Sequence, residues 1–230
     1  EHPFGFANTR LGEGIYDLDA MAENLGKPYR IQDALIIKKY PCCGGNHAML
    51  DSLFSLMRDN DFTYDDVADA EIDQSYFSVV MLYQEPEDEL KGKFSAKYNV
   101  AAALIDGEIG IDTFTDEKIA EHNDKNTMDK VRTRVMAKSE ELLTESGDGL
   151  KVKITLKDGR VFEHITARED ILGSQKNPWG FDAIKEKFQE NVSRVLSANG
   201  TAKAIATWEN IPEMTDIATA IRSTLVAEKS

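Results

Sequence analysis

One predicted hairpin constrains the fold of this chain more than any other feature. Residues 151–156 alternate between polar and apolar side chains, a pattern typical of a strand with one face against a core. The Asp158-Gly159 pair then favours a tight turn, and a second apolar-rich strand follows over residues 161–165. The hairpin therefore predicts a small antiparallel sheet, and we expect helices from the rest of the chain to pack against it.

Helical patterns occur on both sides of the hairpin. Apolar residues at helical spacing predict a helix that begins at Asn46, a suitable N-cap, and a buried helix over residues 94–106 that ends at Gly107. The remaining expected elements are helices over 17–25, 115–119, 181–195 and 214–225, and strands over 70–82 and 131–136. Strands and helices do not alternate regularly, so the expected fold class is α+β. We expect an irregular lead-in over 1–32, an α+β lid-like domain over 33–180 and a helical segment over 181–230.

Composition excludes two classes of function. The chain has 230 residues, with 27 Lys plus Arg against 41 Asp plus Glu and a net charge of −14. This acidity argues against a general nucleic-acid binder, which needs a basic face. The longest apolar run, residues 100–105, is far shorter than the ~20 residues of a membrane helix.

Two further observations concern location and cofactors. Cys42 and Cys43 are neighbours, about 3.8 Å apart at Cα where a disulfide prefers ~4.4–6.8 Å, so we expect free thiols in a reducing compartment, the cytoplasm. No secretory signal is visible at the start of the sequence. Glycine-rich nucleotide motifs and histidine spacings typical of metal ligands are absent, so we expect neither a cofactor nor a metal site.

The segment over residues 38–51 is the first candidate site. A glycine-rich turn brings Lys38 and Lys39 to the start of a predicted helix, where free N–H groups and the helix dipole favour an anion. His47 can exchange protons near neutral pH. The expected anion-binding residues are Lys39, Gly44, Gly45 and Asn46. The alternative is an ordinary loop with surface lysines and a hydrogen-bonded histidine.

Tyr98 forms a second candidate. It lies on the predicted buried helix over residues 94–106, from which its phenol can point into a cleft. The alternative is a core tyrosine whose hydroxyl has a hydrogen-bond partner inside the fold.

The order of motifs resembles the MmgE/PrpD family. The matching features are Lys38-x-Tyr40-Pro41-x-Cys43-x-x-x-His47-x-x-x-Asp51, Phe94-Ser95-x-x-Tyr98-Asn99-Val100-Ala101, Leu104-Ile105-Asp106-Gly107, Gly173-x-x-x-Asn177-Pro178 and Lys187-Phe188. They extend over residues 33–200. The family contains metal-independent dehydratases, decarboxylases and epimerases of small polycarboxylic acids, 2-methylcitrate dehydratase among them.

The resemblance implies a role for this chain and for three of its residues. The chain resembles only the C-terminal half of such an enzyme, a lid with C-terminal helices that would dock on a missing all-helical domain or subunit. Lys38, His47 and Tyr98 match catalytic positions, whereas Cys43 and Asp51 match positions with structural roles. The family implies a homodimer, and the isolated chain is expected to be inactive because other pocket groups belong to the N-terminal half.

Two other interpretations stay open. The chain is a non-catalytic lid or assembly module that requires a separate helical subunit, or it is a structural domain that shares only the fold. Neither the substrate nor the choice between dehydration, decarboxylation and epimerisation follows from the sequence, since one methyl group separates the candidate substrates.

Overall fold

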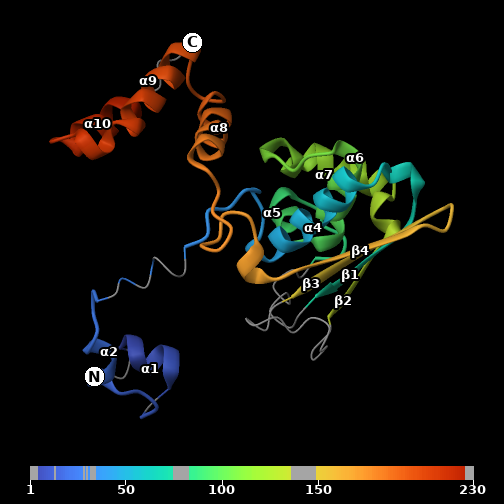
Figure 1. The fold of residues 1–230 in the computed structure, drawn as a ribbon, viewed down its shortest axis with the longest axis horizontal. Helices are drawn as coiled ribbons and strands as arrows, with labels where there is room; N and C mark the ends of the chain where they lie inside the picture. Colours follow the sequence, from blue (N-terminus) through green and yellow to red (C-terminus); the bar gives the residue numbers. More distant parts are fainter. Residues whose placement is uncertain are drawn as a thin grey trace. The chain divides into compact units, whose positions relative to one another are not determined.

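The chain separates into two compact units, Glu1–Ile36 and Ile37–Ser230. The computed structural model describes residues 5–12, 14–27, 29, 31, 35–74, 83–135 and 149–225. The first unit contains two short helices, α1 (Phe6–Leu11) and α2 (Leu18–Ala22) (Figure 1). Asp17 caps α2 by accepting two backbone N–H bonds, so the predicted helix over 17–25 is present but shorter.

The larger unit is built on a four-stranded sheet with the order β2-β1-β3-β4. Its strands are β1 (Val67–Gln74), β2 (Val131–Val135), β3 (Leu150–Leu156) and β4 (Val161–Thr166). The predicted hairpin is confirmed as the antiparallel pair β3–β4, and β3 also pairs antiparallel with β1. The parts of the predicted strands over 75–82 and at Met136 lie outside the described residues.

The sheet is antiparallel as expected except for one pair of strands. β1 and β2 run parallel, with Ala70 opposite Val131, so the sheet is mixed. Parallel neighbours need a long crossover connection. Here the described part of the connection contains three α-helices, namely α5 (Glu89–Lys93), α6 (Ala96–Asp106) and α7 (Asp116–Asp124). Periodicity within one strand does not encode the direction of its neighbour, so the sequence pattern missed this pairing.

Most of the predicted helices are present with slightly different bounds. The helix predicted from Asn46 is α4 (His47–Asp59), and the helix predicted over 94–106 is α6, which ends at Gly107 with φ +72° as expected for a C′ glycine. The side chain of Asn46 does not cap α4 but donates to the Lys93 carbonyl at 3.3 Å. Short 3-10 turns complete the fold: η1 (Gly44–Asn46), η2 (Tyr64–Asp66), η4 (Ile111–Phe114), η5 (Thr127–Lys130), η7 (Arg168–Asp170) and η8 (Ile211–Glu213).

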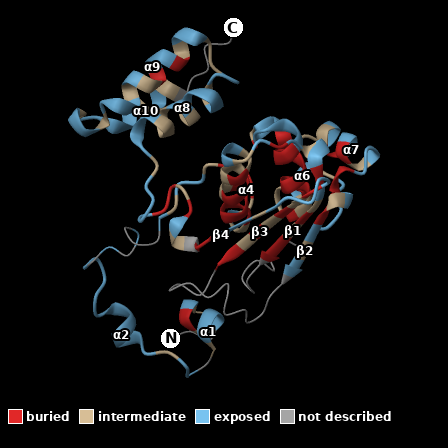
Figure 2. Cartoon of the chain, turned by 45° about the vertical axis from the view of Figure 1, so that its right-hand side comes forward, coloured by how far each residue is buried: buried red, intermediate tan, exposed pale blue. Residues whose placement is uncertain are grey.

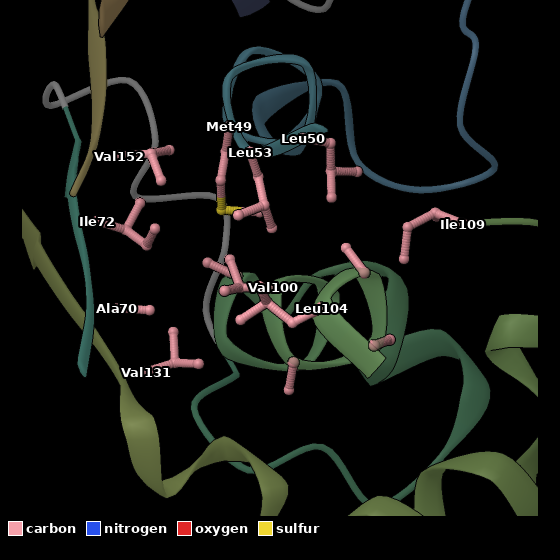
Figure 3. Close-up of a cluster of buried hydrophobic side chains, with 14 of the residues drawn as sticks. Met49, Leu50, Leu53, Ala70, Ile72, Val100, Leu104, Ile109, Val131 and Val152 are labelled. Carbon is pink, nitrogen blue, oxygen red and sulfur yellow. The ribbon is translucent and has the colours of Figure 1, made fainter. Parts of the chain in front are cut away.

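The hydrophobic core lies between the sheet and the helices α4 and α6. Figure 2 shows that buried residues concentrate on these two helices and on the strands beneath them. The side chains that meet there, drawn in Figure 3, include Met49 and Leu53 of α4, Val100 of α6, and Ile72 and Val152 of the sheet. This packing fixes the start of α4, where the candidate site was predicted.

Three helices follow the sheet in the C-terminal part of the chain: α8 (Phe181–Val192), α9 (Ala198–Glu209) and α10 (Ile217–Leu225). The helix α9 was not predicted, because it begins with Ala198-Asn199-Gly200, a composition typical of a turn. The apolar stripe predicted on α8 is present, but no residue of this helix is buried. None of the described helices has the length and apolar character that crossing a membrane requires.

Candidate functional site

The loop that carries Lys38 is joined to a second loop, far away in the sequence, through Gly173. The Ile37 N–H donates to the Gly173 carbonyl at 3.0 Å. Gly173 has φ +94°, and a Cβ atom there would lie 2.1 Å from the Ile37 carbonyl oxygen. Only glycine fits such a close approach in this backbone conformation. Two motifs of the sequence, around Lys38 and around Gly173, therefore meet in space.

Asp51 holds the same two loops together from helix α4. Its carboxylate accepts the Tyr40 hydroxyl at 2.9 Å and the Leu172 backbone N–H at 3.0 Å. Burial and the neighbouring Asp51 charge raise the pKa of Tyr40 well above its usual range, so its hydroxyl remains a donor. These contacts agree with the structural role that the resemblance implies for Asp51.

Three lysines gather where the loops meet. The Lys38 ammonium donates to the Cys42 carbonyl at 3.1 Å, and the Lys187 ammonium of α8 donates to the Lys38 carbonyl. The Lys39 ammonium lies 5.0 Å from the centroid of the Tyr40 ring. Within the described part of the chain, none of these three lysines forms an ion pair with a carboxylate.

Two cavities open beside this cluster, and Lys39, Tyr40 and Phe54 line both of them. The first has a volume of about 280 Å³ and is also lined by Trp179 and Lys187. The second has a volume of about 460 Å³ and extends along α4 toward strand β4. Lys39 therefore lies at the junction of the two cavities, whereas Lys38 lines neither.

His47 lies next to the lysines but is closed to solvent. Its side chain is 1% exposed, and its Nε2 has no hydrogen-bond partner among the described residues. The Tyr40 ring packs edge-on against it, with the ring centroids 5.2 Å apart. Burial, reinforced by the positive charges of Lys38 and Lys187, lowers the pKa of His47 to about 4. The imidazole is therefore neutral at pH 7 and keeps one unsatisfied ring nitrogen.

The glycine-rich turn is less open to an anion than its sequence predicts. The N–H groups of Asn46 and His47 donate to the carbonyls of Cys43 and Gly44, so both are already used within the turn. Asn46 is fully buried, whereas Gly44 is exposed and Gly45 half-buried. Of the residues predicted to bind an anion, Gly44 is the most exposed, and Lys39 lines the two cavities.

Tyr98 lies away from this cluster, in the core. Its side chain is fully buried, and its hydroxyl donates to the Thr113 backbone carbonyl. The His122 ring packs edge-on against it, with the ring centroids 5.1 Å apart. Burial raises the pKa of Tyr98 above its usual range. The structure thus brings Lys38, Lys39 and His47 together but places Tyr98 in the environment of the core-tyrosine alternative.

Sequence reasoning missed two features of this region. Lys187 was recognised only as part of a motif, and no spacing indicated that it reaches Lys38 across 149 positions. The second feature is a polar cluster between α4 and β4, in which the Ser52 hydroxyl lies 3.2 Å from Nδ1 of His164 and 2.5 Å from the Thr166 hydroxyl. Strand alternation placed His164 on β4 but could not pair it with Ser52.

The described residues contain no evident set of metal ligands. No group of three or more His, Cys, Asp or Glu side chains is placed there to hold a metal ion. Cys42 and Cys43 are both free, as predicted, and burial raises the pKa of the Cys42 thiol to about 12.

The structure is thus an α+β domain in which the loop fixed by Gly173 lies beside three lysines and the buried His47. The model of the MmgE/PrpD C-terminal domain matches residues 40–210, more than half of the chain. The chain therefore belongs to the MmgE/PrpD family, as its motifs predicted.

Curated relatives agree with this assignment. The chain is 26% identical to the cis-aconitate decarboxylase of Mus musculus over 134 residues, which cover 57% of this chain and 26% of the relative. It is also 26% identical to the cis-aconitate decarboxylase of Homo sapiens over 132 residues, with the same coverage. The matched region thus spans about a quarter of the length of these relatives.

Proposed function

We propose that this chain is the C-terminal part of an MmgE/PrpD-type enzyme, a dehydratase, decarboxylase or epimerase. It acts on a small polycarboxylic acid by proton transfer next to a carboxylate, without a metal. The observation that carries this proposal is the gathering of Lys38, Lys39 and Lys187, without ionic partners in the described structure, beside a neutral His47. In a chain with a net charge of −14, such a cluster indicates an anionic ligand.

The chemistry needs these residue types. Removal of a proton next to a carboxylate builds negative charge on the carboxylate oxygens, and cations aimed at those oxygens lower the barrier. Lys38 is proposed to bind the carboxylate beside the reacting carbon. Lys39, at the junction of the two cavities, is proposed to bind the rest of the substrate.

His47 is proposed to transfer or position a proton. Its unpartnered Nε2 is closed to solvent in this structure, so the proposal requires the site to open before Nε2 accepts a hydrogen bond from the substrate or from a water molecule. The lysine charges that lower its pKa are offset when an anion binds, so substrate binding makes the imidazole a stronger base. Tyr98 is left out of the proposed machinery because its hydroxyl is committed to the Thr113 carbonyl.

A helical domain or subunit is proposed to complete the site. The relatives are about four times longer than the matched region, and within the described structure α9 covers the apolar stripe of α8 only in part. We therefore expect the isolated chain to bind polycarboxylates without turning them over, and we propose a cytoplasmic homodimer for the complete enzyme, as the family resemblance implies.

The test is Lys38→Ala in the complete enzyme. Loss of a charge-stabilising group at the reacting centre lowers kcat by roughly 10²–10³-fold. Lys203→Ala removes an exposed lysine of α9 and serves as the matched control, for which we expect unchanged turnover. Near-normal turnover of a folded Lys38→Ala variant would contradict the proposal, and loss of activity on treatment with a chelator would contradict metal independence.

The second candidate function is a non-catalytic lid. The closure of His47 and the partly covered face of α8 favour it, because both indicate a chain that depends on a partner. Adding a helical N-terminal half from a family member to this chain separates the two functions: turnover of a polycarboxylate supports the enzyme, and binding without turnover supports the lid.

A further inference from the structure

Lys187 is held in place by two contacts of its ammonium and by a nearby link between two loops. It lies on α8, yet its ammonium donates to the Lys38 carbonyl in the loop before α4. The same ammonium lies 5.7 Å from the centroid of the Trp179 ring, which precedes α8. The loop between β4 and α8 is in turn fixed to Ile37 through Gly173. The contacts of Lys187 with the Lys38 loop and with Trp179, together with the link between Ile37 and Gly173, therefore fix its position beside Lys38.

The electrostatics of this position are unfavourable without a ligand. Lys187 is half-buried, and both burial and the nearby charge of Lys38 lower its pKa. No carboxylate of the described residues forms an ion pair with either lysine to offset the repulsion between them. By contrast Lys185, two residues earlier on the same helix, pairs with Glu209 at 2.6 Å. Two neighbouring cations that form no ion pair with a described carboxylate are the arrangement that an anion with two carboxylates would satisfy.

We propose that Lys187 is a second carboxylate-binding residue of the site, so that Lys38 and Lys187 together select substrates with at least two carboxylates. This inference rests on the proposed function and adds a residue that determines specificity. Glu108, Glu186 and Glu190 also line the cavity that contains Lys187. The carboxylate is therefore placed where Lys187 meets the Lys38 loop, because the three glutamates of the cavity repel it.

The test compares affinities for two probes, tricarballylate with three carboxylates and butyrate with one, measured by calorimetry on this chain. Loss of one charge-assisted contact costs an affinity factor of about ten or more. Lys187→Met is expected to weaken tricarballylate binding by about tenfold and to leave butyrate binding unchanged. Lys187→Gln, which keeps a donor toward the Lys38 carbonyl but loses the charge, is expected to give the same loss and covers the case in which Lys187→Met does not fold.

Lys185→Met is the matched control, since it removes the same charge from the same helix outside the Lys38 contact. The inference is overturned if both folded Lys187 variants bind tricarballylate like the wild-type chain, if Lys185→Met shows the same loss, or if the wild-type chain binds tricarballylate no better than butyrate. The turnover test on Lys38→Ala is independent of these outcomes. An inactive Lys38→Ala enzyme together with normal binding by the Lys187 variants would leave the proposed function standing and remove only the role of Lys187.

Discussion

His47 shows how burial changes the chemistry of a single residue. The residue type alone suggests proton exchange near neutral pH, because an exposed histidine titrates near 6.5. In the folded chain the imidazole is enclosed beside Lys38 and Lys187, and its pKa falls to about 4. The neutral form is therefore the state of this residue at pH 7.

The lowered pKa of His47 predicts a pH dependence of stability. The unfolded chain binds a proton at the histidine near pH 6.5, whereas the folded chain binds it only near pH 4. The free energy of unfolding should therefore fall as the pH decreases between these values, by up to about 3 kcal/mol from this group. Urea unfolding at pH 7, 6 and 5 measures the fall, and a His47→Gln variant with an equally steep fall would contradict the assignment.

The core position of Tyr98 predicts a structural effect without a catalytic one. Tyr98→Phe removes the hydroxyl that satisfies the buried Thr113 carbonyl and should lower the free energy of unfolding by about 1–2 kcal/mol. In the complete enzyme, kcat and KM should change less than twofold. A large drop in kcat with little change in stability would instead support the catalytic role that the sequence suggested.

Among the structural elements, the joint between the loop before α4 and the loop after β4 depends on one glycine. Gly173→Ala places a methyl group 2.1 Å from the Ile37 carbonyl at φ +94°, so we expect a loss of about 2 kcal/mol or more in the free energy of unfolding. The displaced loop should also weaken tricarballylate binding. Gly110→Ala is the control, because its Cβ would meet no atom within 4 Å and its φ is −117°. Equal stability of the two variants would show that the joint is not rigid.

Helices and strands with clear periodicity were predictable one by one. The alternation in β3 and the glycine at the end of α6 are local signals, and the structure confirms both. The helix α9 was missed because its first turn contains Asn199-Gly200, and the parallel pairing of β1 with β2 was missed because it depends on a long crossover. Local patterns report the type of an element but not its neighbour.

At the level of the whole molecule, the C-terminal helices carry an apolar face that the described residues cover only in part. A cavity of about 400 Å³ between α8 and α9 is lined by Phe181, Phe188 and Trp208, and Phe181 is 64% exposed. Phe181→Ala should therefore change the free energy of unfolding of this chain by less than about 1 kcal/mol, whereas Leu53→Ala in the core should cost about 2–5 kcal/mol. Chemical denaturation of the two variants measures the contrast, and comparable losses would show that the α8 face is part of the core.

The amino-acid sequence by itself determined the α+β class, the main hairpin, the buried helix over 94–106 and the family, because each depends on local periodicity or on the order of motifs. It also identified Lys38, Lys39 and His47 as neighbours around one turn. Only the tertiary structure decided that Lys187 joins them, that Tyr98 belongs to the core and that His47 is neutral. Contacts between distant segments and the loss of water around a side chain arise from packing of the whole chain, and no short window of residues contains them.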